Sequence, residues 1–145
     1  MSGRSTRAID YSALAAFRYE IRRFLNFSEA AAREAGIEPQ QHQALLAIKG
    51  RPEIDTTVGV LAERMQIRHH SAVELSRRLE GRGWIRRSRD GCDRREVQLR
   101  LTQRAEKLLA KLSLAHRDEL RTTEPRLVRA LSRVVMRRAR RRRRR

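Results

Sequence analysis

Two helical patterns separated by only three residues constrain the fold of this chain more than any other feature. The first pattern starts at Thr57, whose side chain suits an N-cap. Its inward residues are expected to be Val60, Leu61 and Met65. After a break at 66–68, a second pattern continues to about Glu80 and stops at the Gly-Arg-Gly sequence of 81–83. Two helices joined by so short a turn predict a helix–turn–helix.

A two-stranded hairpin is expected directly after these helices. Residues 84–87 and 96–101 alternate apolar and polar side chains, and Asp90 and Gly91 supply turn chemistry between them. The hairpin is rich in arginine, so it would hold positive charge at the tip of a wing. Together these elements predict a winged helix–turn–helix over residues 37–101.

Amphipathic helices are predicted on both sides of the hairpin and the helix pair. One covers 11–35 and ends at Gly36, a short one covers 39–49, a fifth starts after Thr102, and a sixth starts near Pro125. The apolar stripes of the long helices exceed what a winged helix–turn–helix can cover, so a second copy of the chain is the expected partner. The residues expected at this dimer interface are Leu14, Leu127, Leu131, Val134 and Val135.

The expected fold class is therefore mainly α with a small β-hairpin wing, in which N- and C-terminal dimerisation helices flank the winged helix–turn–helix. Residues 1–136 are expected to form a single domain, with the dimerisation helices in 10–35 and 102–136. Residues 137–145 contain eight arginines. Like charges at this density predict a disordered basic tail that adds affinity for any nucleic acid.

Charge and cysteine content narrow the class of partner. The 145 residues include 35 Lys and Arg against 17 Asp and Glu, a formal net charge of +18. Subtracting the eight tail arginines leaves +10 on residues 1–136, an excess that favours a polyanionic partner such as nucleic acid. Cys92 is the only cysteine, so no intrachain disulfide is possible. The longest apolar run, 44–48, is too short to span a membrane, and a cytoplasmic, nucleoid-associated protein without membrane contact is expected.

One face of the predicted second helix of the pair is expected to read DNA bases. At about 100° per residue, one side gathers Ala72, Leu75 and Leu79 for packing. The opposite side gathers His70, Val73, Glu74 and Arg77. Arg77 would pair with guanine or phosphate, and Glu74 would accept a hydrogen bond from cytosine. The alternative is a solvated polar face without a partner. Further DNA-contact candidates near the start of the helix are Arg68, His69 and Ser71.

The sequence contains no pattern that indicates catalysis or a metal site. The adjacent His69 and His70 would diverge by about 100° on a helix, and no cysteine or carboxylate supports them at ligand spacing. No nucleophile–base arrangement and no glycine-rich phosphate loop is found. We therefore expect no metal, no cofactor and no enzymatic activity.

Four short motifs resemble the MarR family, the bacterial multiple-antibiotic-resistance-type regulators. They are Leu-Ala-Glu-Arg at 61–64, Leu-Glu-Gly-Arg-Gly at 79–83, Asp-Arg-Arg at 93–95 and Leu-Arg-Leu-Thr at 99–102. All four stand in the family's order, and the flanking helices are similar to its dimerisation helices. The resemblance implies a winged helix–turn–helix homodimer that binds double-stranded DNA, more often as a repressor.

The resemblance also implies roles for the wing residues. Arg95 would enter the minor groove, with Asp93 pairing to its guanidinium, and a narrow minor groove does concentrate negative potential. Arg87, Arg89 and Arg94 would make phosphate contacts that carry no sequence information. The alternative for Asp93 and Arg95 is a surface salt bridge of little consequence. Arg68 departs from the family, whose members often have a serine cap there.

Relatives in the family often bind small aromatic or phenolic acids in a cleft beside the DNA-binding lobe, so an effector of this class is a possible partner. The residues that would line such a pocket are Phe17, Arg18, Tyr19, Phe24 and His42. The alternative for these aromatic residues is ordinary core packing. Cys92 is expected to be an incidental exposed thiol, with redox sensing as the alternative.

The sequence thus predicts a transcriptional regulator that binds a palindromic operator as a homodimer, and the resemblance implies a repressor more often than an activator. One alternative is a sequence-indifferent nucleic-acid-coating or RNA-binding protein driven by basic charge. A second is a protein–protein adaptor that uses the apolar helices. A regulator would prefer its own site by about 10³-fold or more at physiological salt, whereas a coating protein would not.

Overall fold

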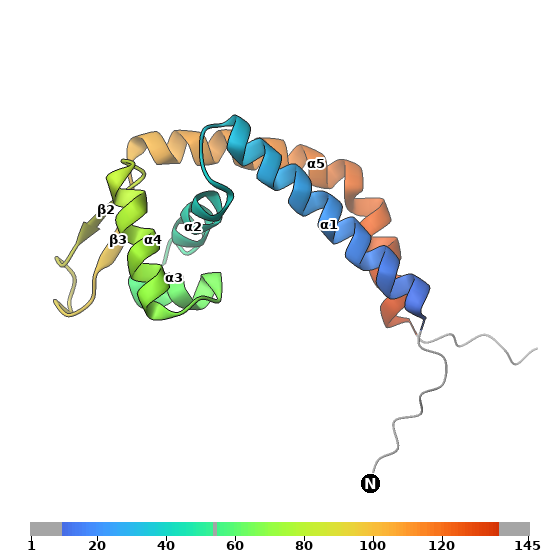
Figure 1. Cartoon of the computed structure of the whole chain (residues 1–145), viewed down its shortest axis with the longest axis horizontal. Coiled ribbons are helices and arrows are strands. Elements are labelled where there is room, and N and C mark those ends of the chain that lie inside the picture. Colours follow the sequence, from blue (N-terminus) through green and yellow to red (C-terminus); the bar gives the residue numbers. More distant parts are fainter. Residues whose placement is uncertain (1–9, 54, 137–145) are drawn as a thin grey trace, which may run out of the picture. The chain divides into compact units, whose positions relative to one another are not determined.

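The computed structural model describes residues 10–53 and 55–136 (Figure 1). Its elements in chain order are α1 (Tyr11–Glu34), α2 (Pro39–Lys49), β1 (Thr56–Thr57), α3 (Val58–Met65), α4 (His69–Gly81), β2 (Ile85–Ser88), β3 (Gln98–Leu101) and α5 (Gln103–Val135). The predicted fold class, mainly helical with a small winged sheet, is confirmed. No helix within the described ranges is both long enough and apolar enough to cross a membrane.

The chain divides into two compact units. The winged-helix unit covers residues 28–116, and the two-helix unit combines residues up to 27 with those from 117 onward. The predicted winged helix–turn–helix range, 37–101, lies inside the first of these units. The single domain predicted over 1–136 stays a prediction.

The helix boundaries of the winged-helix unit follow from local chemistry. The Thr57 side chain accepts a hydrogen bond from the main-chain N–H of Val60 at 3.2 Å, which confirms its predicted role as N-cap of α3. Thr102 does the same for α5 through the N–H of Ala105, also at 3.2 Å. Gln66 ends α3 in the left-handed region, with φ of 54°, and so forms the turn of the helix–turn–helix.

The sheet has three strands, one more than predicted, in the order β1-β3-β2. β2 pairs antiparallel with β3 from Ile85 opposite Leu101 to Ser88 opposite Gln98. The two-residue β1 pairs with the other side of β3. Asp90 and Gly91, which were expected to supply turn chemistry between the strands, lie in the loop 89–97, which projects beyond the paired strands (Figure 1). We call this segment the wing loop.

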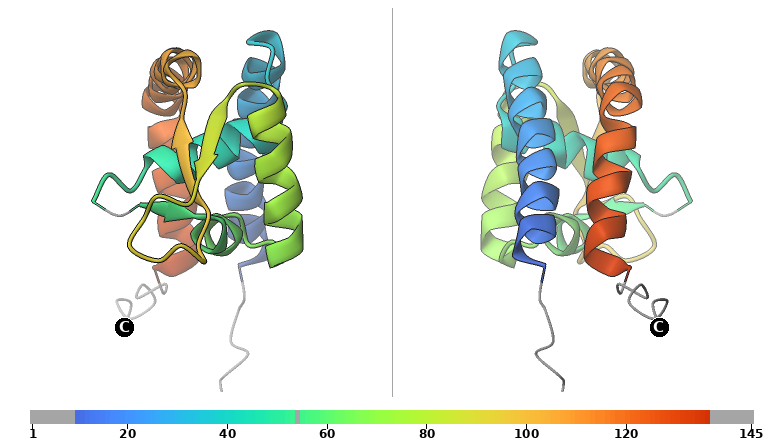
Figure 2. Two further views of the ribbon diagram at one scale, coloured as in Figure 1. Left: turned by 90° about the vertical axis from the view of Figure 1, so that its left-hand side faces the viewer. Right: turned by 90° about the vertical axis from the view of Figure 1, so that its right-hand side faces the viewer.

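The core of the winged-helix unit gathers apolar residues from the helices of that unit and from β2 and β3. Ala72, Leu75 and Leu79 of α4 are buried in it, as their predicted inward positions require. Trp84 is also buried, and the guanidinium carbon of Arg104 lies 4.0 Å from the centre of its ring. This packing holds α4 and the sheet together, with the strands leading out to the wing loop (Figure 2).

In the two-helix unit, the first part of α1 and the last part of α5 run antiparallel. Asp10 at the start of α1 lies 3.8 Å from Arg133 near the end of α5. Further along, Glu20 lies 3.6 Å from Arg126. The small residues Ala13 and Ala130 are buried.

The predicted sixth helix starting near Pro125 was wrong, because α5 runs without interruption from Gln103 to Val135 with Pro125 inside it. Proline inside a helix removes one backbone hydrogen bond and crowds the carbonyl four residues earlier, which usually kinks the helix or ends it. In the turns before it, the Thr122 and Thr123 hydroxyls donate to the carbonyls of Asp118 and Glu119. α5 nevertheless continues past Pro125, and apolar residues recur on both sides of it.

Candidate nucleic-acid interface

The outward face of α4 carries the predicted base-reading residues. Arg68 is the N-cap residue, but its side chain makes no capping hydrogen bond. The exposed residues at and after this position are Arg68, His69, His70, Glu74 and Arg77, whereas Ser71 and Val73 are half-buried. The helix therefore presents a continuous polar surface opposite its buried side.

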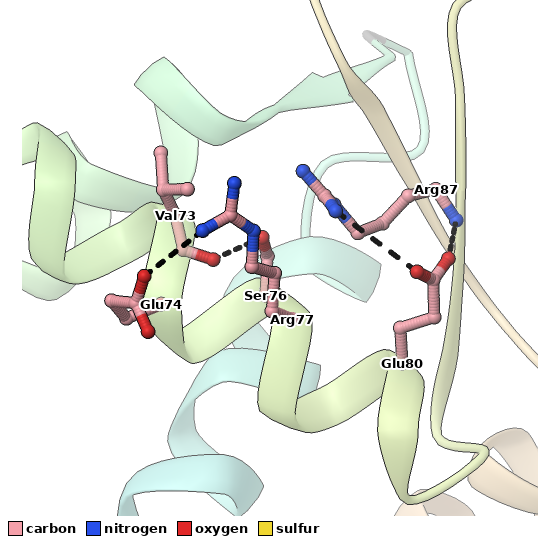
Figure 3. A network of polar contacts seen from close by, with 6 residues as sticks. All are labelled: Val73, Glu74, Ser76, Arg77, Glu80 and Arg87. Carbon is pink, nitrogen blue, oxygen red and sulfur yellow. Dashed lines mark hydrogen bonds and ion pairs between the residues drawn. The ribbon is translucent and has the colours of Figure 1, made fainter.

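Glu74 and Arg77 form an ion pair on this surface. Arg77 Nη1 donates to Glu74 Oε1 at 3.0 Å, and the two side chains are 60 % and 59 % exposed (Figure 3). An exposed pair three residues apart on a helix adds little to stability. Both groups can therefore leave this ion pair and form hydrogen bonds with base edges instead.

The wing loop is organised by two main-chain contacts. Asp93 Oδ1 accepts a hydrogen bond from the main-chain N–H of Arg95 at 2.9 Å. Arg89 Nη1 donates to the carbonyl of Arg94 at 3.4 Å. Asp93 thus shapes the turn through the Arg95 backbone, whereas the resemblance implied a pair with the Arg95 guanidinium. The side chains of Arg89, Arg94 and Arg95 are exposed.

Arg87 is placed differently from the other wing arginines. Its side chain is only 21 % exposed and runs back toward α4, where Nη1 lies 4.0 Å from Glu80 Oε1 (Figure 3). Its main-chain N–H donates to Glu80 Oε2 at 3.0 Å. Sequence reasoning missed Glu80 as a partner, because a spacing of seven residues across a helix end and a turn corresponds to no helical or strand periodicity.

The structure leaves the predicted effector pocket untested. Phe17, Arg18, Tyr19 and Phe24 belong to the two-helix unit and His42 to the winged-helix unit. Arg23 lies 5.8 Å from the centre of the Tyr19 ring.

His42 is buried on α2, with its ring centre 5.0 Å from that of His116 on α5. Burial, together with the charge of His116, lowers the pKa of His42 below its ordinary value. His116 in turn contacts the Ser28 hydroxyl through Nε2 at 2.8 Å and the Leu112 carbonyl through Nδ1 at 2.6 Å. Because a carbonyl only accepts, Nδ1 of His116 is the donor in the second contact.

The predicted dimer residues lie in the two-helix unit. Leu14 is 41 % exposed, Leu131 43 % and Val135 69 %, whereas Leu127 and Val134 are half-buried. Tyr11 and Val128 of the same unit are exposed as well. The unit thus carries uncovered apolar side chains.

The remaining sequence predictions concern Cys92, a metal site and the arginine tail. Cys92 is a free, exposed thiol in the wing loop. Across residues 10–53 and 55–136, no three histidines, cysteines or carboxylates come together as metal ligands. The tail, 137–145, lies outside the described residues.

Comparison with known proteins agrees with the winged-helix geometry. The model of the MarR family matches residues 35–96, the segment that holds the helix–turn–helix and most of the wing. No curated protein sequence matches the chain.

Solved structures match over most of the chain. MepR, a transcription regulator of the Staphylococcus aureus multidrug efflux pump MepA, is 21 % identical, with a TM-score of 0.68 over 81 % of this chain and 84 % of its own. AbsC of Streptomyces coelicolor, a MarR family transcriptional regulator, is 17 % identical, with a TM-score of 0.69 over 90 % and 93 %. A MepR mutant bound to an oligodeoxyribonucleotide is 20 % identical, with a TM-score of 0.64 over 88 % and 99 %. At these identities the likeness shows the fold.

The exposed face of α4 and the arginine-bearing wing loop lie in one compact unit, which has the winged helix–turn–helix fold. The family match falls on this unit. The chain is thus similar to the MarR family: the family model matches residues 35–96, and the solved MarR family regulators share its fold.

Proposed function

We propose that this protein is a sequence-specific regulator that binds a palindromic duplex operator as a homodimer. The observation that carries the proposal is the division of α4 into a buried side and an exposed polar side, in the same compact unit as the wing arginines. A helix of this kind fits the major groove, and a hairpin loop fits the adjacent minor groove.

Within this proposal, α4 and the wing loop have different tasks. Glu74 and Arg77 read base edges, with Arg77 donating to guanine and Glu74 accepting from cytosine. Arg95 enters the minor groove, and Arg89 and Arg94 contact phosphates. The turn at Asp93 supports this assignment, because its hydrogen bond to the Arg95 N–H fixes the backbone from which the Arg95 side chain extends.

The homodimer rests on the uncovered apolar side chains of the two-helix unit. Leu14 and Leu131 are partly exposed on helices that the antiparallel ion pairs of Asp10 and Glu20 hold side by side. A two-fold dimer would cover these residues and place two copies of α4 at a fixed spacing. Solved relatives include MepR in a DNA-binding conformation, which has the same fold.

We further propose repression in the cytoplasm as the biological role, with binding rather than catalysis as the activity. A protein that occupies an operator blocks transcription without a chemical step. Release by a small aromatic or phenolic acid is the corresponding proposal for regulation, and it follows from the family resemblance.

Selection from a random duplex library tests the proposal. The purified full chain is expected to enrich an inverted repeat whose half-sites lie about 10–10.5 base pairs apart, centre to centre, or a multiple of this distance. Enrichment of a single half-site would refute the dimeric arrangement. A library that stays random after repeated rounds would refute sequence-specific binding and favour the charge-driven coating protein.

A further inference from the structure

We propose that Glu80 and Arg87 form a tether that positions the wing relative to α4, and that Arg87 acts through this tether rather than as a phosphate contact. Glu80 is in the last turn of α4, and Arg87 is on β2, two residues before the wing loop begins. The inference rests on the proposed function, because the tether joins the two elements that would contact DNA.

Two contacts form the tether, and both converge on one carboxylate. Glu80 Oε2 accepts from the main-chain N–H of Arg87 at 3.0 Å, and Glu80 Oε1 lies 4.0 Å from Arg87 Nη1 (Figure 3). A hydrogen bond to an ionised acceptor is stronger than one between neutral groups. The carboxylate therefore holds the backbone of Arg87 by a hydrogen bond and lies beside its guanidinium as an ion pair.

The main-chain contact is the more informative of the two. β2 is an edge strand, because β3 lies between it and β1. An edge strand has N–H groups on its outer side that find no partner in the sheet. The Arg87 N–H points away from β3 and donates to Glu80. A residue of α4, rather than a further strand, therefore satisfies this N–H group at the edge of the sheet.

The Arg87 side chain is in a poor position for contact with a phosphate. It is 21 % exposed, against 60 % for Arg77 on α4, and it extends toward α4 (Figure 3). Its Nε is buried and has no hydrogen-bond partner among the described residues. A guanidinium that lies against α4 presents fewer donors to a phosphate than an exposed one does.

The direction in which one substitution changes DNA affinity distinguishes the tether from a simple charge effect. Glu80→Ala removes a negative charge beside the wing, so charge alone predicts tighter DNA binding. If Arg87 contacted phosphate and Glu80 only competed for it, the variant would also bind more tightly. The tether predicts the opposite, a loss of about 3- to 10-fold in operator affinity, because the wing arginines are no longer held at a fixed place.

Variants that keep part of the tether sharpen the test. Glu80→Gln retains an oxygen that accepts from the Arg87 N–H, so an intermediate loss is expected. Arg87→Ala combined with Glu80→Ala is expected to lose less than the product of the two single losses, since both remove one unit. Glu34→Ala is the matched control, because Glu34 is exposed, ends α1 and forms no side-chain hydrogen bond or ion pair among the described residues. Its operator affinity is expected to match the parent or exceed it slightly.

Cys92 supplies a readout that does not depend on DNA. It is the only cysteine of the chain and lies exposed in the wing loop, so a nitroxide label can be attached without further substitution. The electron paramagnetic resonance spectrum of the label is expected to show greater mobility in Glu80→Ala than in the parent, and no change in Glu34→Ala. Circular dichroism checks that each variant is folded. If Glu80→Ala does not fold, Glu80→Gln takes its place in the test.

The outcomes separate this inference from the proposed function. Tighter operator binding by Glu80→Ala, or an unchanged label spectrum, would overturn the tether. A more mobile label with unchanged operator affinity would overturn its role in DNA binding. If the parent protein prefers no DNA sequence while the label still responds to Glu80→Ala, the tether stands as a feature of the fold and the proposed function fails.

Discussion

Arg77 Nη1 lies 3.0 Å from Oε1 of Glu74, one turn earlier on the exposed face of α4. The free protein thus keeps a donor and an acceptor of base-reading chemistry paired with each other. Since both side chains are exposed, the pair can open on DNA at little cost. A guanine and a cytosine would then replace the two intramolecular partners.

Arg77→Ala should weaken operator binding by about 1–3 kcal/mol and relax base preference at one position in each half-site. The reason is that a bidentate arginine contact to guanine discriminates against the other bases. Binding to the selected operator and to its single-base variants measures both effects. An equal loss for every duplex would make Arg77 a phosphate contact instead.

Arg95→Ala should also weaken operator binding by about 1–3 kcal/mol, while leaving the dimer intact. Its side chain is exposed in the wing loop, on a backbone that Asp93 holds through the Arg95 N–H. Arg129→Ala is the matched control, since it removes one exposed arginine from α5 in the other compact unit. Equal affinities of the two variants would remove Arg95 from the interface.

Leu131→Asp should convert the dimer into monomers or aggregates, because it places a charge among the apolar side chains proposed to meet across the two-fold axis. Analytical ultracentrifugation measures the change. Leu46→Asp is the control, because Leu46 is 46 % exposed on α2 and Leu131 is 43 % exposed. A Leu131→Asp dimer with native operator affinity would place the interface elsewhere.

The buried His42 should make folding sensitive to mild acid. Because burial and His116 lower the pKa of His42 from 6.5, the folded state disfavours the imidazolium, whereas the unfolded chain protonates near that value. The contribution of His42 to the free energy of unfolding is therefore complete above pH 6.5. It falls as the pH drops below 6.5 and stops changing once the pH is below the pKa of the folded state.

His42→Gln should show a smaller loss of stability than the parent between about pH 7.5 and pH 5, because the replacement does not titrate. Urea unfolding at the two pH values measures the difference, and titrating groups that do not contact His42 contribute equally to both proteins. A parallel decline in the two proteins would rule out His42 as the source.

The parts of the fold that depend on local chemistry were predictable from sequence. Thr57 and Thr102 are caps in the structure because their hydroxyls satisfy N–H groups three residues later, a spacing that the sequence shows directly. The buried side of α4 was likewise predictable, since Ala72, Leu75 and Leu79 repeat at helical spacing.

The parts that depend on distant neighbours were not predictable. The strand at Thr56 and Thr57 is too short to show alternation, and it exists because β3 is there to pair with it. Pro125 indicated a helix boundary, but the packing pattern on either side of it continues one helix. The Glu80 contact with Arg87 follows from how α4 meets β2, which no local pattern encodes.

The central claim is tested most directly by comparing two affinities of the full chain across a salt series. One is the affinity for the selected operator, and the other is the affinity for a shuffled duplex of equal length and composition. A regulator that reads bases through α4 should prefer the operator by about 10³-fold or more at physiological salt, and should keep the preference as salt rises. Operator and shuffled affinities that stay equal and fall together with salt would contradict the account and leave a protein that binds nucleic acid by charge alone.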